Sequence, residues 1–555
     1  MGLARAHAIA LVGVQGHAVE IEADIENGMV ALLLVGLPDT ALREARDRIR
    51  SAIVNSGESW PTRRITVGLS PASLPKRGSG FDLGIAMAIL AAAGAVPAAA
   101  LRGLVLIGEL GLDGRVRPVP GVLPAAAAAA AAGFDAVAVA TENAPEAALV
   151  PELKVIAVPS LSAFTAFIRN GTRSGDTGVQ VLEPGRDIGA ICGAGHREES
   201  AGQAAPAADR GAEAGPAGSG GTARLTIAGH SAMPTSAKDL ADLVGQPVAR
   251  RAAEICAAGG HHLMLLGPPG CGKTMLAERI PTVLPRLEPA AALEVSAIHS
   301  VAGTLPPGRP LVTEPPFCAP HHTSTRAAIV GGGSGVIKPG AASLAHHGCL
   351  FLDEAPEFGR DVLDALRQPL ESGEVVVARA AVTARFPAKF TLIMAANPCA
   401  CASARSAGSA CSCTPLARRR YLARLSGPLL DRVDAKIEFL PVRRAELLSD
   451  RAFTEPSSVV AERVRAARLR AAARLAGTPW RLNAQIPGSE LRRRFAPARG
   501  ALAPLERAMD LGRISARGAD RVIRLSWTLT DLAGLHSPGS SEVGYALGLW
   551  LGTPR

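Results

Sequence analysis

Apolar residues over the first 168 positions fall into short runs separated by stretches with helical spacing. The runs VALLLVGLP and RITVGLSP end in Gly or Pro and predict strands, with a helix between them over residues 43–55. A second helix is predicted from Phe81, and an Ala-rich helix precedes the strand-like run DAVAVATEN. Strands and helices joined by short loops predict a compact α+β domain over residues 1–168.

The remaining chain divides by composition into three parts. Residues 169–236 are rich in Gly, Ala, Pro and Glu without periodicity, which predicts a disordered linker. Ordered structure is expected to resume at residue 237 and to form a core that ends near residue 440. Residues 441–545 are Arg-rich and have helical spacing, as in VVAERVRAARLRAAARLAG, and predict a helical C-terminal domain.

A glycine-rich phosphate-binding loop, GPPGCGKT, occupies residues 267–274 and follows the predicted buried strand HHLMLLG. Its glycines allow backbone N–H groups to turn toward a triphosphate, and the helix that begins near Lys273 points its positive end at the phosphates. Lys273 is expected to reach the β and γ phosphates of ATP, and the Thr274 hydroxyl is expected to bind Mg²⁺. The expected nucleotide-binding residues are Gly267, Pro268, Pro269, Gly270, Cys271, Gly272, Lys273 and Thr274.

The run CLFLDE at residues 349–354 provides the acidic half of such a site. Its apolar residues predict a buried strand that carries Asp353 to the strand end, where the carboxylate can hold magnesium. Glu354 is then placed to polarise the attacking water. Further on, the strand in KFTLIMAANP ends on Asn397, which can hold that water or sense the γ-phosphate.

Two segments around this acidic run are additional to a minimal nucleotide-binding core. A Gly-rich, mobile loop is expected where the chain between Lys273 and Asp353 is longer than one helix and one strand require. After Glu354, a helix is predicted over FGRDVLDALRQPLESG, followed by a hairpin with a basic tip. The loop carries His321, His322, Arg326 and Lys338.

Arg432 follows a short predicted helix in SGPLLDRVD. An Arg in this position of an oligomeric ATPase reaches into the neighbouring subunit's site and offsets charge in the transition state. An ordinary surface ion pair is the other interpretation of Arg432.

Four of the nine cysteines lie close together, directly after Asn397. Two C-x-C pairs separated by nine residues could bind one tetrahedral zinc ion, because thiolates are soft ligands. Reduced, merely structural cysteines are the alternative. The four are Cys399, Cys401, Cys411 and Cys413.

The net charge of +10 favours a polyanionic partner. The charge is concentrated, since residues 441–530 hold eighteen Arg, no Lys and eight acidic residues. The first residues contain no apolar run long enough for a signal peptide, and the Ala-rich stretch over residues 85–101 is expected to be a buried helix rather than a membrane span. These features predict a cytoplasmic protein without a membrane partner.

Motifs in all three expected domains resemble those of the ComM/YifB type of magnesium-chelatase-like AAA+ ATPases. They include FDLGIAMAILAA, GELGLDGRVRPVPGVLPAA, APHHTST, SLAHHGCLFLDEAPEF, MAANPCAC, SGPLLDRVD and ISARGADRVIRLSWTLTDLAG. The resemblance implies an α/β multidomain protein with three parts: a Lon-protease-like α+β domain, an AAA+ core with a parallel sheet, and a helical lid. It also implies a hexameric ring that translocates DNA and promotes branch migration in recombination of incoming DNA.

The resemblance assigns further roles to residues of this sequence. It implies that Asn397 is the first sensor, that Arg432 is the arginine finger and that Arg517 is the second sensor, with Arg521 as the alternative. Residues 321–340 match the family's extra helix-2 insert. Ala341 stands where family members usually carry Glu, so the resemblance leaves open how that insert is coupled to the rest of the ring. In the hairpin that lines the pore, Arg379, Arg385 and Lys389 would contact DNA phosphates without reading bases, although a solvated hairpin face is the alternative.

Proteolysis is excluded by the residues of the first domain. Asp82 stands where a Lon-type protease has its Ser nucleophile, and the stretch PGVLPAA offers no Lys to activate one. Two functions remain: an ATP-driven DNA translocase or helicase, and a chelatase-like ATPase that remodels a protein partner without nucleic acid.

Overall fold

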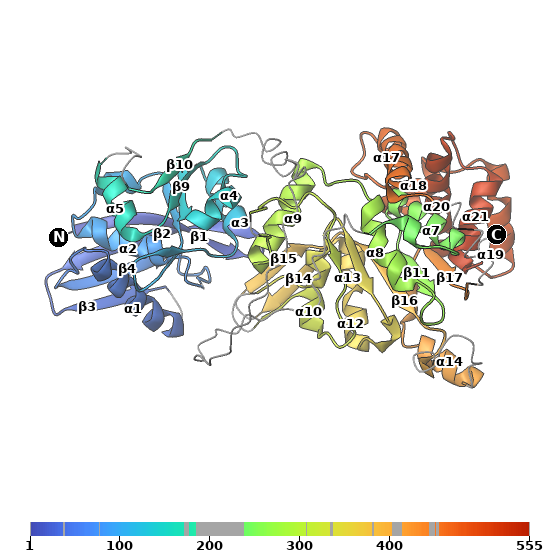
Figure 1. Ribbon diagram of the computed structural model, residues 1–555, viewed down its shortest axis with the longest axis horizontal. Helices are drawn as coiled ribbons and strands as arrows, with labels where there is room; N and C mark the ends of the chain where they lie inside the picture. The colour runs from blue at the N-terminus through green and yellow to red at the C-terminus, as the bar shows by residue number, and fades with distance from the viewer. Residues whose placement is uncertain are drawn as a thin grey trace, which may run out of the picture.

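Three blocks of structure follow one another along the longest axis of the molecule, with the two chain termini at opposite ends (Figure 1). The computed structural model describes residues 2–36, 39–76, 78–170, 177–184, 238–306, 308–333, 337–379, 382–401, 413–442, 450 and 454–553. Helices accompany both a mixed and a fully parallel sheet, so the predicted α/β class is confirmed. Among the helices in these ranges, none combines the length and apolar character needed to cross a bilayer.

The N-terminal block is built on an eight-stranded sheet in the order β10-β9-β8-β5-β1-β2-β4-β3. Alternate residues of its long central pair are buried, among them Ala6 on β1 and Ile21 on β2, because successive side chains of a strand point to opposite faces. The helix α2 packs on this buried face and is itself buried along almost its whole length. The buried helix expected over residues 85–101 ends at Ala92, because Gly94 takes a left-handed conformation and Pro97 follows. The strands are β1 (Gly2–Val12), β2 (Gln15–Glu26), β3 (Ala31–Val35), β4 (Arg64–Ser70), β5 (Leu104–Ile107), β6 (Glu109–Leu110), β7 (Val116–Arg117), β8 (Ala136–Ala140), β9 (Lys154–Val158) and β10 (Gln180–Leu182). The helices are α1 (Asp39–Asn55), α2 (Asp82–Ala92), η1 (Ala98–Leu101), α3 (Val122–Ala131), η2 (Thr141–Asn143), α4 (Ala144–Ala147) and α5 (Leu161–Asn170).

The last strand of this sheet lies inside the segment predicted as a linker. β10 pairs antiparallel with β9, and Val179 beside it is 1% exposed. The sheet gains a strand here because Val179 and Val181 pack against its apolar core, a local pattern that the Gly- and Ala-rich composition of the segment hides. Residues 185–237 of the predicted linker lie outside the described ranges.

The central block contains five parallel strands in the order β12-β13-β16-β11-β17. Parallel strands end at one edge of a sheet, so the residues that follow β11, β13 and β16 come together there. The strands are β11 (Leu263–Leu266), β12 (Phe317–Cys318), β13 (Cys349–Leu352), β16 (Thr391–Ala396) and β17 (Ala435–Glu438). The helices are η4 (Leu240–Asp242), α7 (Pro247–Gly259), α8 (Lys273–Val283), α9 (Pro289–Ala302), α10 (Arg326–Val330), α11 (Ala341–Leu344), η5 (Ala355–Glu357), α12 (Arg360–Ala365), α13 (Arg367–Ser372), α14 (Pro415–Leu422) and α15 (Gly427–Leu430).

Two of these elements differ from the sequence pattern. The single helix predicted after Glu354 is interrupted at Leu366, between α12 and α13. Pro369 explains the break, because its ring nitrogen cannot donate the hydrogen bond that would continue α12 into α13. The expected mobile loop over residues 321–340 contains the short helix α10 and an antiparallel bridge between Gly332 and Lys338.

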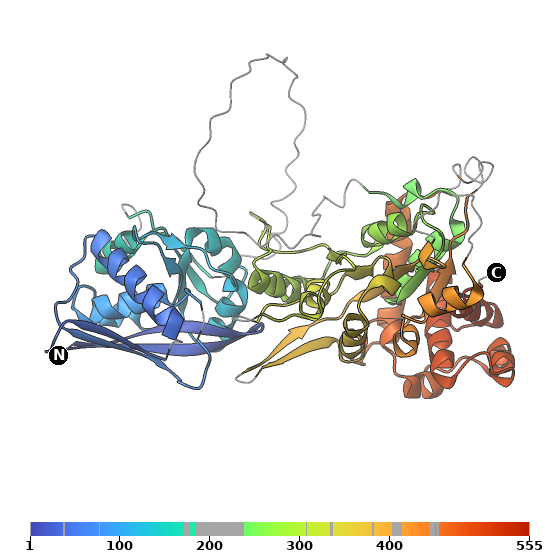
Figure 2. The same ribbon diagram turned by 90° about the horizontal axis from the view of Figure 1, so that it is seen from below.

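The predicted hairpin is present as β14 (Glu374–Arg379) and β15 (Val382–Pro387). It extends from the central block toward the β1–β2 end of the N-terminal sheet (Figure 2). Phe386 is fully buried there, with Leu11, Val12 and Val14 packed against its cluster. At the β1–β2 turn, a side chain on Gly13 would meet the Arg385 carbonyl oxygen at 2.7 Å, so the backbones can approach this closely only with glycine. The N-terminal block therefore supports the base of the hairpin.

The C-terminal block is helical, as predicted. Its helices α17 and α20 pack against α7, and α17 also packs against α8, the helix that begins at the phosphate-binding loop. An ion pair between Arg474 and the buried carboxylate of Asp531 joins α17 to α20. The elements are α17 (Ser457–Arg474), η7 (Asn483–Gln485), α18 (Gly488–Arg493), η8 (Arg499–Leu502), α19 (Ala503–Asp510), α20 (Ala516–Ala533) and α21 (Ser540–Leu551).

Candidate functional site

The loop between β11 and α8 has a backbone conformation that requires glycine. Gly270 and Gly272 have φ values of 76° and 96°, in the left-handed region that residues with a side chain rarely adopt. A Cβ atom on Gly267 would lie 2.6 Å from Cβ of Phe439. The loop leads directly into the first turn of α8, which begins at Lys273, so the unpaired N–H groups of that turn face the loop. This is the geometry of an anion-binding helix terminus.

Lys273 and Asn397 meet inside this loop, although 124 positions separate them in the chain. The Lys273 ammonium donates to the carbonyl oxygens of Gly267 at 2.7 Å and Pro268 at 2.8 Å, and to Oδ1 of Asn397 at 3.1 Å. Both side chains are buried. The contact arises because Asn397 directly follows β16, which is the sheet neighbour of β11.

Thr274 and Asp353 form the second contact between the two motifs. The Thr274 hydroxyl donates to Oδ2 of Asp353 at 2.7 Å, and Oδ1 of Asp353 accepts the backbone N–H of Glu354 at 2.9 Å. A hydroxyl and a carboxylate this close are hard oxygen ligands of the kind that Mg²⁺ prefers. The two residues thus fit the magnesium-holding role expected of them.

Glu354 adopts a conformation that is uncommon for a residue with a side chain. Its φ is 51°, and the turn is held by a hydrogen bond from the Glu357 N–H to the Glu354 carbonyl oxygen at 2.7 Å. Its carboxylate remains accessible, and Oε2 lies 3.4 Å from Nδ1 of His322. Backbone strain of this kind is concentrated at functional sites, where it fixes the direction of a reactive side chain.

Arg432 and Arg517 lie together, away from the site formed by Lys273 and Asp353. They line a pocket of about 210 Å³ with Arg521 and Arg524, and Arg432 contacts Glu371, the ion pair that the sequence left open as an alternative. Burial and the neighbouring charges of Arg521, Arg367 and Arg517 lower the pKa of Arg432. Glu371, Asp431 and Asp520 line the same pocket, so its four guanidinium groups outnumber its carboxylates by one and leave it weakly basic.

This arginine pocket is on the sheet edge opposite the phosphate-binding loop. Arg432 precedes β17, which begins beside Leu263 of β11, whereas the loop follows β11 after Leu266. A strand of this length spans about 13 Å at 3.3 Å per residue. In a single chain, Arg432 therefore does not share the site of Lys273.

Arg521 has a structural contact that distinguishes it from Arg517. It pairs with the buried carboxylate of Asp434, whose Oδ2 accepts the His262 N–H at 2.9 Å. Burial alone would raise the pKa of Asp434, but Arg521 and the His261 side chain bring that pKa well below its usual range. Arg521 thereby joins α20 to the start of β17, which favours Arg517 as the arginine available to a ligand.

The basic residues of the hairpin and insert are exposed. Arg379, at the end of β14, lies beside the insert, since a Cβ atom on Gly332 would be 3.9 Å from its guanidinium. Arg385 and Lys389 are exposed, and Arg385 pairs with Glu374 at 3.3 Å. The exposed surface formed by Arg326, Lys338 and Arg379 is called the basic surface below.

Cys399, Cys401 and Cys413 converge just beyond Asn397. Their sulfur atoms all lie within 4.8 Å of one another, and Cys399 is buried. Ligand sulfurs on a tetrahedral zinc ion are about 3.8 Å apart, given Zn–S bonds of about 2.3 Å, so the three fit one ion. Cys411, the fourth predicted ligand, lies outside the described residues.

Glu294, His346 and His347 form another group of potential ligands. His346 Nδ1 accepts the Lys389 N–H at 2.9 Å, so the ring proton is on Nε2, which donates to Glu294 at 3.1 Å. Hydrogen bonds from His346 and His347 lower the pKa of Glu294 to about 2. A metal ion could bind Nε2 of His346 only by displacing its proton, so the group does not form a metal site in this state. It is a hydrogen-bonded cluster that ties α9 to the segment before β13.

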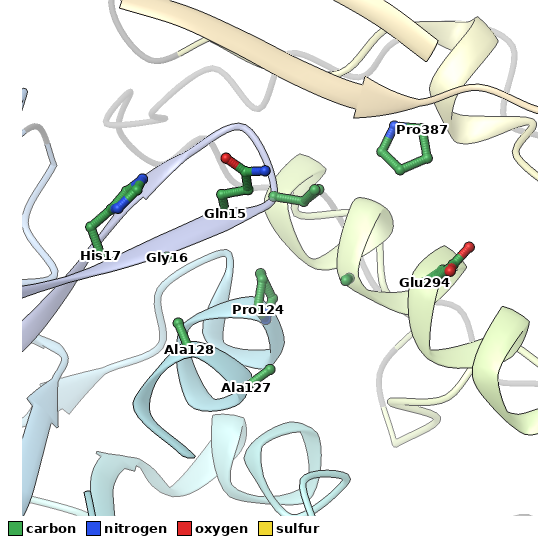
Figure 3. A pocket seen from close by; sticks show the side chains of 10 residues that line it. Gln15, Gly16, His17, Pro124, Ala127, Ala128, Glu294 and Pro387 are labelled. Atoms are coloured by element: carbon green, nitrogen blue, oxygen red, sulfur yellow. The ribbon is translucent and has the colours of Figure 1, made fainter. Parts of the chain in front are cut away.

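Glu294 also lines a hollow of about 460 Å³ between the first two blocks of the molecule. In Figure 3, Gln15, His17 and Pro124 lie on the N-terminal side of this hollow, and Glu294 and Pro387 lie on the central side. Its lining is mostly apolar and carries none of the predicted nucleotide-site residues.

Asp82, the residue at the position of a Lon-type nucleophile, is buried at the start of α2. Its Oδ2 accepts a hydrogen bond from Nε of Arg48 at 2.8 Å, and burial raises its pKa to about 6. A carboxylate held by a guanidinium supplies no serine hydroxyl for acyl transfer.

Three residues beside the site, Leu243, Gln246 and His322, make contacts that the sequence pattern does not predict. The Gln246 amide donates to the Leu440 carbonyl oxygen at 2.9 Å and reaches that of Cys271 at 3.4 Å, and Leu243 packs where a Gly272 side chain would be. The one feature of the sequence that could have indicated Leu243 and Gln246 is their place just before α7, the helix that leads to β11. His322 belongs to a quoted motif, but only the structure shows its contact with Glu354.

Comparisons with known proteins cover nearly the whole chain. The family description "Magnesium chelatase, subunit ChlI" matches residues 239–447, "Subunit ChlI of Mg-chelatase" matches residues 21–143, and "Magnesium chelatase, subunit ChlI C-terminal" matches residues 454–549. The chain is 37% identical to competence protein ComM of Haemophilus influenzae, over 99% of this chain and 97% of the relative. It is 38% identical to protein YifB of Salmonella typhimurium, over 96% and 94%, and 47% identical to an uncharacterised Mycobacterium tuberculosis protein, over 99% and 98%.

Proposed function

We propose that this chain, which belongs to the ComM/YifB-type magnesium-chelatase-like family, is an ATP-driven AAA+ motor that assembles into a ring and translocates DNA. The family implies use of nucleotide and Mg²⁺. The main support for the proposal is a pair of hydrogen bonds at one sheet edge, Lys273 to Asn397 and Thr274 to Asp353. The exposed basic surface lies on the same block of the molecule. The name of the relative ComM, a competence protein, favours a role in recombination of incoming DNA.

Residues at neighbouring strand ends would have different roles in ATP hydrolysis at this site. The loop N–H groups and Lys273 would bind the phosphates, while Thr274 and Asp353 would hold the magnesium ion, which would supply neutralising charge at the phosphates. Glu354 accepts a proton from the attacking water, and Asn397 orients that water. The three N–H donors of the Lys273 ammonium are occupied by the Gly267 and Pro268 carbonyl oxygens and by Asn397, so at least one of these hydrogen bonds would be exchanged for a phosphate oxygen when ATP binds.

The arginine pocket would complete the site of the neighbouring subunit. Because Arg432 and Arg517 are on the opposite sheet edge from their own phosphate-binding loop, they can approach a γ-phosphate only across a subunit boundary. An incoming phosphate would replace the Glu371 carboxylate as the partner of Arg432. Hydrolysis would then depend on the assembled ring, for which six subunits are the family expectation.

The basic surface would contact DNA phosphates without reading bases. We expect single-stranded or forked DNA to stimulate ATP hydrolysis several-fold at low salt and less as salt rises, because phosphate contacts release counterions. The measurement is the steady-state ATPase rate of the full-length protein with and without DNA. Arg379→Ala should reduce the stimulation, whereas Arg115→Ala, at an exposed arginine on an N-terminal turn, should not. An ATPase indifferent to DNA would favour the alternative, a chelatase-like ATPase that remodels a protein partner.

The cysteine cluster is proposed to bind one structural zinc ion through Cys399, Cys401 and Cys413. A zinc-held loop directly after Asn397 would stiffen the strand end that positions this residue. Elemental analysis of full-length protein purified without chelator should find about one zinc ion per chain. The double variant Cys399→Ser with Cys401→Ser should lose it, while Cys256→Ala, at a buried cysteine of α7, should retain it. Zinc-free wild-type protein, or unchanged zinc in the double variant, would refute the assignment.

A further inference from the structure

We infer that the β1–β2 turn of the N-terminal block, residues 13–14, anchors both the β14–β15 hairpin and the insert and thereby fixes the position of the basic surface. Where this role concerns DNA it rests on the proposed function, in which the basic surface contacts phosphates. It gives the N-terminal block, which lacks a Lon-type nucleophile, a task in the motor: the block positions the residues that contact DNA.

One small apolar cluster joins the turn to both segments that carry the basic surface. Its centre is formed by Ala384 and Phe386 of β15, which are fully buried, and by Val301 of α9. Val14 of the turn and Ile337 of the insert pack against this centre. The N-terminal block, the hairpin, the insert and α9 therefore meet at one point.

Gly13 brings the backbone of the turn against the backbone of the hairpin. It has a φ of 66°, and a Cβ atom added to it would lie 2.7 Å from the carbonyl oxygen of Arg385 and 3.3 Å from its backbone nitrogen. A carbon atom cannot approach a backbone oxygen so closely, so any side chain at this position would push the turn away from β15.

The N-terminal block is itself fixed on α9, and so it gives the turn a firm support. The Ser300 hydroxyl of α9 donates to the buried carboxylate of Glu146, which also accepts the Leu123 N–H at 2.9 Å. The Gly121 N–H donates to the Ser300 carbonyl oxygen at 3.1 Å, and α3 packs against α9. Because these contacts hold the block on one side of the hairpin, the turn limits how far the hairpin can tilt.

The anchored point is close to the residues of the basic surface. Arg385 is paired with Val376, and Arg379 lies three residues further along β14, which is about 10 Å at 3.3 Å per residue. In the insert, Lys338 directly follows Ile337. A tilt of the hairpin would displace Arg379 from Lys338. Charges that are held in place before binding lose less conformational entropy on binding, so an anchored hairpin should bind DNA more tightly than a free one.

The test uses full-length protein with Gly13→Ala and two measurements. The first is amide hydrogen exchange over residues 374–387 without DNA, which should become faster because the hairpin opens more often. The second is the concentration of single-stranded DNA that gives half-maximal stimulation of the ATPase. We expect it to rise by about fivefold or more, since the hairpin must then be ordered on binding. The rate without DNA should stay within about twofold of wild type, because no nucleotide-site residue belongs to the cluster.

Two further variants separate the contact from backbone strain. Gly133→Ala puts alanine at another left-handed glycine of the same block, with a φ of 81°, where no atom lies within 4 Å of the added Cβ. It should match wild type in both measurements. Gly13→Asn adds the Cβ atom with a residue that tolerates the left-handed region, so it should resemble Gly13→Ala. Wild-type behaviour of Gly13→Asn would assign the effect to strain and overturn the inference.

Two other results would also overturn it. Unchanged hairpin exchange in both Gly13 variants would show that the turn does not hold the hairpin. Faster exchange without a change in the half-maximal DNA concentration would show that the turn does not position the basic surface. Failure of the DNA-translocase proposal would appear separately, as a wild-type ATPase that DNA does not stimulate, and the exchange measured without DNA would still decide whether the turn anchors the hairpin.

Discussion

Glu354→Gln is expected to lower kcat for ATP hydrolysis by at least about 100-fold while ATP binding is retained, because a general base contributes 10²- to 10⁴-fold. Glutamine keeps the size of the side chain but cannot accept the proton of the attacking water. The phosphate contacts through Lys273 and the Thr274–Asp353 pair do not involve the Glu354 side chain. The measurement pairs steady-state hydrolysis with equilibrium binding of a fluorescent ATP analogue.

Glu357→Gln is the matched control for this variant. Glu357 is three positions further along the same turn, and its carboxylate pairs with Arg424 at 2.8 Å rather than facing the magnesium-holding residues. The control removes the same charge and should keep kcat within a few-fold of wild type. Turnover that survives intact in Glu354→Gln would contradict its assignment as the base.

Arg432→Ala is expected to reduce the ATPase of the assembled ring by about 10³-fold or more, the range for loss of an arginine finger. The expected loss follows from the proposed role, since Arg432 is on the sheet edge opposite its own phosphate-binding loop and would act on a neighbour's nucleotide. Arg465→Ala, which removes an exposed arginine paired with Glu462 on α17, should have little effect.

Mixing two inactive variants tests action between subunits. An Arg432→Ala subunit retains its phosphate-binding loop, and a Lys273→Ala subunit retains Arg432, so mixed rings should contain competent boundaries and regain part of the activity. The ATPase rate should pass through a maximum as the mixing ratio is varied. If no ratio restores activity, Arg432 does not act on a neighbour's nucleotide.

The residues of the nucleotide site could be named from the sequence because the physics that places them is local. Each follows a short apolar run, and such runs become parallel strands whose ends meet at one edge. Asp353 after β13 and Asn397 after β16 are therefore found where the pattern predicts them. The glycines of the loop were likewise readable, since their left-handed backbone is a property of the residue itself.

Contacts between distant segments could not be read in this way. The order of the strands puts His322 against Glu354, and the parallel start of β17 puts Arg432 on the far edge from Lys273. Neither follows from spacing along the chain, because strand order depends on how the sheet as a whole packs. The break at Leu366 is a smaller case, where helical periodicity concealed the effect of Pro369.

By itself, then, the sequence determined which side chains are chemically able to bind phosphate, hold magnesium and accept a proton, since those abilities belong to residue types and to their immediate neighbours. Only the tertiary structure decided which of them contact one another. It joined Lys273 to Asn397 in one place, and it gathered Arg432 with Arg517 in another. The physical reason is that packing brings together residues that are 124 positions apart in the first pair and 85 in the second, and the energy of that packing is distributed over the whole core.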